Sequence, residues 1–196
     1  WKGGDHADRY LRETMFGPVH PRATGLVGLS MTEGLDLTLP GFGPFGTAGA
    51  HCFDPNFHVY RRIAALAAIR QHFPVLRVGR QYLRPVSLFG GPFLLQGPGE
   101  LVSWSRILSD EEALCVINAH GTQTRGGDVV VDADLNQPGM ALTVIANSME
   151  AGGRTSAEIA HPVGSQLSIK QRSDGTAFVE IRHLAPSAVI VAVNHP

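Results

Sequence analysis

Residues 54–79 read DPNFHVYRRIAALAAIRQHFPVLRVG, and this stretch holds a helix together with the point at which helical periodicity ends. Apolar side chains recur in it at steps of three and four residues, which predicts one helix over about residues 56–72. The apolar stripe consists of Val59, Ile63, Leu66, Ile69 and Phe73. Asp54 is a favourable N-cap, Pro55 suits the first helical position, and Pro74 ends the helix.

Beyond Gly79 the period changes to two, which indicates half-buried β-strands. Eight segments have this pattern: Tyr82–Leu88, Glu100–Leu108, Ala113–Ala119, Asp128–Asp132, Ala141–Asn147, Gln166–Gln171, Ala177–Leu184 and Ala188–Val193. Turn clusters separate them, among them Gly126–Gly127 and Ser173–Gly175, and the second of these predicts a hairpin. Short antiparallel strands at this spacing predict an all-β sandwich over residues 79–196, after a different unit over residues 1–78.

The composition excludes several classes of protein. The 196 residues include 16 Lys and Arg against 17 Asp and Glu, a net charge of -1, so a nucleic-acid partner bound through a broad basic face is not expected. No apolar run reaches the roughly 18 residues of a membrane helix, so no membrane partner is expected.

Residues Trp1–Asp5 contain neither an initiator Met nor an apolar signal region. We therefore expect a processed chain or a piece of a longer protein.

The first 53 residues form two further zones. Trp1–Gly17 is short and charged, whereas Pro18–Phe53 is rich in Gly and Pro, has no sustained period and is typical of a long loop on a large scaffold. The densest charged group of the chain lies in the first zone and comprises Asp8, Arg9, Arg12 and Glu13. Their i,i+4 spacing favours a solvated helical turn over a loop that presents Arg and carboxylate to a polar ligand.

Other patterns that could carry chemistry lack the necessary context. Gly41–Gly46 satisfies G-x-G-x-x-G, but no strand precedes it and no periodic helix follows it, so a dinucleotide site is not expected. Gly28–Thr32 lacks the second Gly of a nucleophile elbow. Among nine histidines, the nearest cluster of possible ligands is His51, Cys52 and His58, and its spacing fits no common metal site. We expect no metal and no cofactor, and we expect Trp104 to pack against a core rather than stack on a sugar ring.

Three segments, taken in order, resemble the C-terminal third of α-amylase-family glycoside hydrolases. Ile63-x-x-Leu66-x-x-Ile69-Arg70-x-x-x-Pro74-x-Leu76-x-x-Gly79 resembles the last barrel helix and its passage into the C-terminal β-domain. Asp8–Gly17 and Trp104–Glu112, the latter continuing through Asn118-x-His120, resemble segments of a bacterial branch of that family. The resemblance covers most of the chain apart from residues 18–53.

The resemblance implies the final segment of a (β/α)8 barrel, consisting of a long loop and the last helix, followed by an antiparallel β-sandwich. It also implies a retaining α-glycosidase that acts on α-glucans or α-glucosides. The family's nucleophile Asp, its acid/base Glu and its Asn-His-Asp segment have no match here, so no catalytic residue is assigned and the chain alone should be inactive. Asp8, Arg9 and Arg12 are the candidates for the edge of the substrate cleft.

A second hypothesis stays open, namely a standalone β-sandwich module that binds carbohydrate or protein without catalysis. The two hypotheses differ in what should cover the stripe of Val59, Ile63 and Leu66. A helix that evolved to cover an absent barrel should leave that face exposed or bury it against the Gly-rich segment. A stripe that is fully covered within a closed small domain would favour the standalone module.

Overall fold

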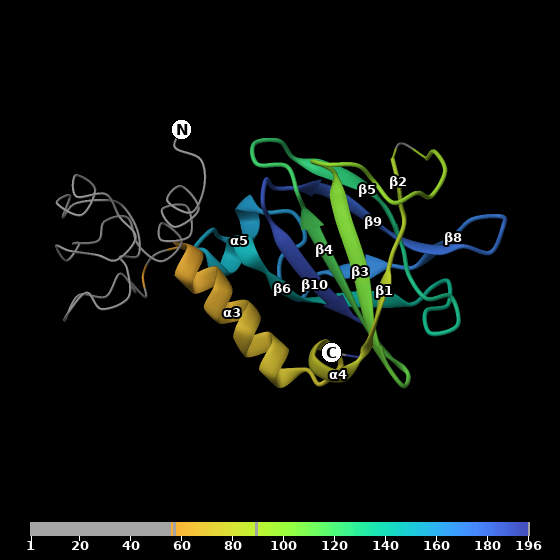
Figure 1. The fold of residues 1–196 in the computed structure, drawn as a ribbon, viewed down its shortest axis with the longest axis horizontal. Helices are drawn as coiled ribbons and strands as arrows, with labels where there is room; N and C mark the ends of the chain where they lie inside the picture. The colour runs from red at the N-terminus through yellow and green to blue at the C-terminus, as the bar shows by residue number, and fades with distance from the viewer. Residues whose placement is uncertain (1–55, 57, 89, 196) are drawn as a thin grey trace, which may run out of the picture. The chain divides into compact units, whose positions relative to one another are not determined.

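The structure is a computed structural model that describes residues 56, 58–88 and 90–195. In it, two antiparallel β-sheets follow one long helix (Figure 1). The chain divides into two units, residues 1–64 and 65–196, and both sheets belong to the second unit. Helix α3 (His58–His72) runs across this division and is followed by the single-turn helix α4 (Val75–Val78). None of the described helices is long and apolar enough to cross a membrane.

The larger sheet has six strands in the order β1-β3-β4-β10-β6-β7. Their bounds are β1 Arg80–Leu83, β3 Leu101–Leu108, β4 Glu111–Asn118, β10 Val189–Val193, β6 Ala141–Asn147 and β7 Gln166–Ser168. The smaller sheet has the order β2-β5-β9-β8, with β2 Val86–Ser87, β5 Arg125–Val130, β9 Ala177–Leu184 and β8 Lys170–Gln171. Two short helical segments, α5 (Ser148–Ala151) and η1 (Ser156–Glu158), follow β6. The prediction of an antiparallel, β-rich domain is confirmed.

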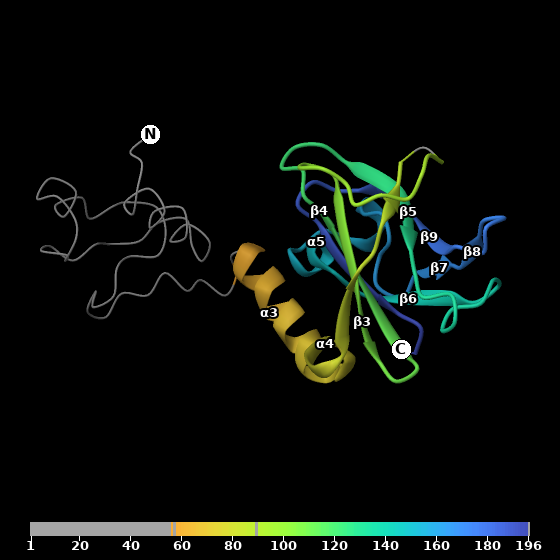
Figure 2. The ribbon, with the colours of Figure 1, turned by 45° about the vertical axis from the view of Figure 1, so that its right-hand side comes forward.

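The main core lies between the two sheets, because alternate residues of most strands point inward. Leu114 and Ile190 from the large sheet and Val129 and Ile181 from the small sheet belong to one buried cluster. A second cluster lies on the opposite face of the large sheet, where Leu66, Ile69 and Val75 pack against Cys115 and neighbouring side chains. Figure 2 shows the C-terminal part of α3 (residues 65–72) and α4 on that side, away from the small sheet. Trp104 packs at the edge of this second cluster, as predicted.

The predicted helix and hairpin are both present. Helix α3 ends at His72 as expected, and Pro74 occupies the N-cap position of α4. Asp54 and Pro55, the expected start signals, lie outside the described residues. Strands β8 and β9 pair across the turn at Ser173–Gly175, where Gly175 adopts a φ of 89°. A positive φ favours Gly, which explains how the turn sequence fixes the hairpin.

Two of the predicted strands are each split between the sheets. The segment Tyr82–Leu88 forms β1 in the large sheet and β2 in the small one, and Pro85 lies at the crossing, where its missing N–H costs no ladder bond. The segment Gln166–Gln171 likewise gives β7 and β8 on either side of the buried Ile169. A period of two identifies an extended chain but does not say which sheet it joins.

One turn prediction is wrong. Gly126 and Gly127 lie inside β5 rather than in a turn before the strand. A Cβ on Gly126 would lie 2.9 Å from the Ile181 carbonyl oxygen, and one on Gly127 would lie 2.6 Å from Cγ1 of Val86. Both glycines are therefore required by close neighbours within the sheet rather than by the backbone of a turn.

Candidate functional site

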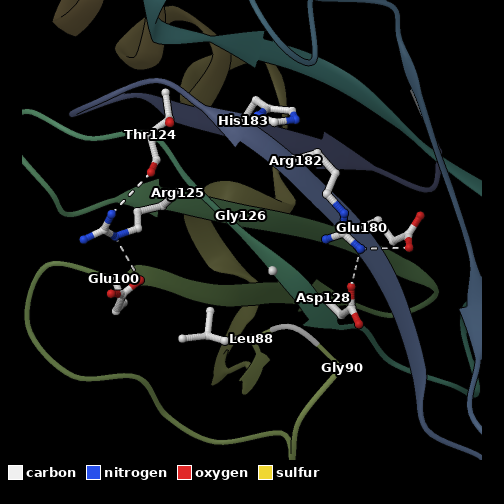
Figure 3. Close-up of a pocket in the computed structure, with 11 residues that line it drawn as sticks. Leu88, Gly90, Glu100, Thr124, Arg125, Gly126, Asp128, Glu180, Arg182 and His183 are labelled. Carbon is white, nitrogen blue, oxygen red and sulfur yellow. Dashed lines mark hydrogen bonds and ion pairs between the residues drawn. The ribbon is translucent and has the colours of Figure 1, made fainter.

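A pocket lies where the outer face of the small sheet meets the chain before β3 (Figure 3). We call it the β5–β9 pocket, and its volume is about 800 Å³. It is lined by Leu88, Gly90, Glu100, Thr124, Arg125, Gly126, Gly127, Asp128, Glu180, Arg182 and His183. Volumes of about 300–1,000 Å³ are typical of sites for small molecules.

A β-bulge shapes the floor of the pocket. Arg125 pairs with Leu184 and Gly127 with Ile181, so the single residue Gly126 stands opposite two residues of β9, Arg182 and His183. His183 takes up the distortion with a φ of 54°. A non-glycine residue in this region is strained, and bulges commonly redirect side chains beside binding sites. The Gly126 position permits the bulge because it has no Cβ to strike the Ile181 carbonyl.

Two groups of charged side chains form opposite walls of the pocket (Figure 3). On one wall, Arg182 Nη2 lies 2.7 Å from Asp128 Oδ1 and 2.8 Å from Glu180 Oε1. On the other, Arg125 Nε lies 3.0 Å from Glu100 Oε2. The hydrogen bond from Lys170, together with the charge of Arg182, lowers the pKa of Glu180. Carboxylates held ionised in this way accept hydrogen bonds rather than donate protons.

Arg172 holds the segment after β2 against the sheet beside this pocket. Its guanidinium lies 4.0 Å from the centre of the Phe93 ring and donates to the Gly91 carbonyl at 2.8 Å. It also donates to Ser87 Oγ at 2.7 Å and lies 3.4 Å from Asp128 Oδ2. Asp128 is therefore only 8% exposed and is paired with both Arg172 and Arg182. Its role is to hold these side chains in place rather than to react.

Most of the candidates from the sequence fall outside the described part of the chain. Asp8, Arg9 and Arg12, as well as Glu13, lie there, together with Gly28–Thr32, Gly41–Gly46, His51 and Cys52. Within the described ranges, no group of three or more His, Cys, Asp or Glu side chains is arranged to hold a metal. The substrate-cleft assignment of Asp8, Arg9 and Arg12 therefore stays a prediction.

The residues of the Asn118-x-His120 segment have structural roles. Asn118 is fully buried, and its Nδ2 donates to the carbonyls of Gln123, Leu184 and Ala185 at 2.8–3.0 Å. Nδ1 of His120 accepts hydrogen bonds from the backbone amides of Thr122 and Gln123. Both side chains fix the loop between β4 and β5.

Sequence reasoning did not find the pocket, because its residues come from three separate segments. The available signal was the Gly126–Gly127 pair, since glycine inside an alternating strand indicates a bulge or a close backbone approach. Nothing local to the sequence brings Glu100 beside Arg125, because Glu100 precedes β3 of the large sheet and Arg125 lies in β5 of the small sheet.

No known family model matches this chain, and no curated protein matches it. Among solved structures, it is similar to a debranching enzyme from Nostoc punctiforme, with 22% identity and a TM-score of 0.35 over 68% of this chain and 21% of that one. It is also similar to a trehalose-6-phosphate hydrolase from Bacillus licheniformis, with 16% identity and a TM-score of 0.36 over 71% of this chain and 19% of that one. The chain spans about a fifth of the length of each.

Proposed function

We propose that this chain is the C-terminal part of a retaining, α-glucan-active enzyme of the α-amylase family. In this proposal residues 1–78 end the catalytic barrel, residues 79–196 form a β-domain that stabilises it, and the catalytic acids lie outside the chain. Asp8, Arg9 and Arg12 then contribute to the edge of the substrate cleft. The substrate and its products are handled by the barrel and not by the sheets.

The observation that carries the proposal is the passage from helix to sheet. Helix α3 leads through α4 directly into β1, and the residues on this path are those that resemble the family. Val75 is fully buried in the second cluster, and Leu76 packs against that cluster. The Gly79 amide donates to the Val75 carbonyl at 3.1 Å, and a Cβ on Gly79 would lie 2.9 Å from the Ile107 carbonyl oxygen. The motif therefore fixes the joint at which a helix meets the edge of the sheet.

The helix side of the large sheet also carries apolar surface that supports a neighbouring domain. Leu83 stands opposite Trp104 in the β1–β3 register, so both lie on this face, and Leu83 is 60% exposed. Val102, opposite Ile117 on the same face, is 44% exposed. Within the predicted stripe the result is mixed, because Ile63 is 39% exposed whereas Leu66, Ile69 and Phe73 are partly buried against the second cluster. Such an apolar surface is typical of a face that another domain covers.

Three carboxylates in or beside the described sheets favour a non-catalytic role for the β-domain. Glu112 is paired with Arg84, Glu100 with Arg125, and Asp128 with two arginines. A retaining glycosidase needs one carboxylate free to attack and one carboxylic acid free to donate, about 5–5.5 Å apart across the glycosidic bond. Each of these three carboxylates is held in ion pairs within the domain, which favours a structural role for it.

The test compares the whole product of the gene with the 196-residue chain. Release of reducing sugar from starch and from maltose is measured for both, at equal molar concentration. We expect activity from the whole product only. A cooperative thermal transition of the 196-residue chain, followed by far-UV circular dichroism, confirms that its inactivity does not come from unfolding.

Two outcomes would overturn the proposal. One is release of sugar by the folded 196-residue chain, which would place catalytic acids within it. The other is an upstream reading frame that encodes no barrel with Asp and Glu at its strand ends. Substitution of Arg12 by Ala in the whole product tests the cleft assignment separately, and an unchanged kcat/KM would remove Arg12 from the cleft.

A further inference from the structure

We infer that Arg106 forms an ion pair with a carboxylate of a neighbouring domain, at the border of the apolar face that Leu83, Val102 and Trp104 present. The partner that fits this face is a protein surface with apolar side chains and an Asp or Glu beside them. That this surface belongs to the catalytic barrel rests on the proposed function. The charge state of the face, from which the inference starts, does not depend on that function.

Arg106 differs from the other half-buried arginines of residues 79–196. Each of those has a carboxylate oxygen at 2.8–3.4 Å, and the pairs are Arg84–Glu112, Arg125–Glu100 and Arg172–Asp128. Arg106 is also half-buried, yet it has no ion pair with any described residue. A charge that is partly withdrawn from water is costly unless a group of opposite charge or hydrogen bonds compensate it. Arg106 therefore lacks the compensation that the comparable arginines have.

Neutral groups alone bind the Arg106 guanidinium within the described part of the chain. Nη2 donates to the Arg77 carbonyl at 3.1 Å, and Nη1 donates to Gln81 Oε1 at 3.3 Å. Nε is buried and has no hydrogen bond to a described residue. Both Nη bonds lie at the surface, and each Nη atom has a second hydrogen. A carboxylate that approaches from outside can therefore bind both Nη atoms at once.

The elements around Arg106 supply no carboxylate for it. Helix α4 and strands β1 and β3 contain no Asp or Glu, whereas their arginines are Arg77, Arg80 and Arg106. By the β3–β4 register, Glu111 lies diagonally from Arg106 on the same face. Burial raises the pKa of Glu111, and the charges that act on this carboxylate are those of His195 and Asp110 rather than of Arg106. The positive charge of the joint is therefore open to an acidic partner.

The surroundings of Arg106 match the composition of a protein interface. Alternate residues of a strand share a face, so Val102, Trp104 and Arg106 lie in a row on the helix side of the large sheet. Val102 is exposed, as is Leu83 beside Trp104. Interfaces typically have an apolar centre and a polar border, and they are enriched in Arg and depleted in Lys. Helix α4, β1 and β3 contain no Lys, which agrees with this pattern.

The experiment compares the reaction of Arg106 with phenylglyoxal, which modifies accessible guanidinium groups, in the 196-residue chain and in the whole product of the gene. Peptide mass spectrometry measures the rate of modification at each arginine. We expect Arg106 to react about tenfold more slowly in the whole product, because an interface excludes solvent and reagent. Arg154, an exposed arginine after α5, is the internal control and should react equally in both.

Substitution then tests the charge itself. Arg106→Gln removes the charge but keeps a group that can donate to the Arg77 carbonyl. It should lower the Tm of the whole product by about 2 °C more than that of the 196-residue chain. The difference should shrink in about 1 M NaCl, because salt screens an ion pair at the border of an interface. Arg106→Lys keeps the charge and should restore part of the loss, and Arg154→Gln, the matched control, should shift neither Tm.

Three results would overturn the inference. The first is equal reactivity of Arg106 in the two forms. The second is protection of Arg106 in the 196-residue chain that increases with its concentration, which would make a second copy of the chain the partner. The third is an equal loss of Tm in both forms on Arg106→Gln, which would give the charge a role within the β-domain only.

None of these readouts depends on the release of sugar. An active whole product in which Arg106 reacts freely would overturn this inference alone. An inactive whole product in which Arg106 is protected would count against the proposed function alone.

Discussion

Nη2 of Arg84 lies 2.8 Å from Oε1 of Glu112, and this ion pair closes one end of the main core. The Glu112 side chain is fully buried and that of Arg84 is 12% exposed. Glu112 also accepts hydrogen bonds from Ser105 Oγ, from Asn136 Nδ2 and from the Asp132 amide. A buried carboxylate is tolerated only when its oxygens are satisfied, and here four donors from three segments converge on it.

Replacement of Glu112 by Ala should therefore destabilise the β-domain by about 3–5 kcal/mol, because it leaves the mostly buried Arg84 guanidinium with only the more distant Asp132 carboxylate, at 3.5 Å. Urea unfolding followed by circular dichroism measures the loss. Glu111→Ala, at the adjacent and less buried position, is the control and should cost about 1 kcal/mol or less. Equal losses in the two variants would mean that the Arg84–Glu112 ion pair contributes no more to the free energy of unfolding than the side chain of Glu111 does.

Gly79→Ala tests the joint between helix and sheet. The new methyl carbon would lie 2.5 Å from the Val75 oxygen and 2.9 Å from the Ile107 oxygen, both of them backbone atoms that cannot swing aside. We expect a loss of about 1–3 kcal/mol in the free energy of unfolding. Gly97→Ala serves as the matched control, because a Cβ there meets nothing within 4 Å and the backbone needs no positive φ. A Gly79→Ala variant as stable as Gly97→Ala would show that the joint is not tightly packed.

His161 should make stability depend on pH. Burial lowers the pKa of His161, and this effect exceeds that of the hydrogen bond with the Arg182 backbone, which acts in the opposite direction. Above the ordinary value of 6.5 the ring is neutral in both states and this stabilisation is complete. Below it the unfolded chain takes up the proton first, so stability falls as the pH falls toward the folded-state pKa.

Urea midpoints measured between about pH 5 and pH 8 check this dependence. His161→Asn keeps a hydrogen-bonding side chain without a titration in this range, so its slope below pH 6.5 should be shallower than that of the parent. His72→Asn, at an exposed position of α3, should keep the parental slope. Parallel curves for all three chains would exclude His161 as the titrating group.

Cys115 should be inert in the folded protein. Its side chain is 5% exposed, and burial raises the pKa of the thiol to about 12. Because the thiolate is the reactive form, Ellman's reagent should not modify Cys115 until the chain unfolds. The measurement uses a Cys52→Ser background so that one thiol is counted. Rapid reaction without denaturant would show that the second cluster opens readily.

Local sequence patterns predicted the bounds of the helix and strands better than they predicted which strands pair with one another. The stripe from Val59 to Phe73 predicted the extent of α3, and the alternation along Ala177–Leu184 predicted β9 to the residue. The segment Tyr82–Leu88 has the same alternation, yet Pro85 divides it between two sheets. Gly126–Gly127 has turn-forming composition, yet both residues lie in β5 because neighbours from β2 and β9 approach them too closely for a side chain.

The sequence by itself determined a helix followed by short antiparallel strands, because periodicity and turn chemistry depend only on residues close together in the chain. Tertiary structure alone decided which strands share a sheet, that Glu112 and Arg84 meet in the core, and that Glu100, Arg125 and Arg182 surround one pocket. Those relations join residues tens of positions apart. They depend on which faces of the strands and sheets pack together, and this cannot be read from a pattern of neighbouring residues.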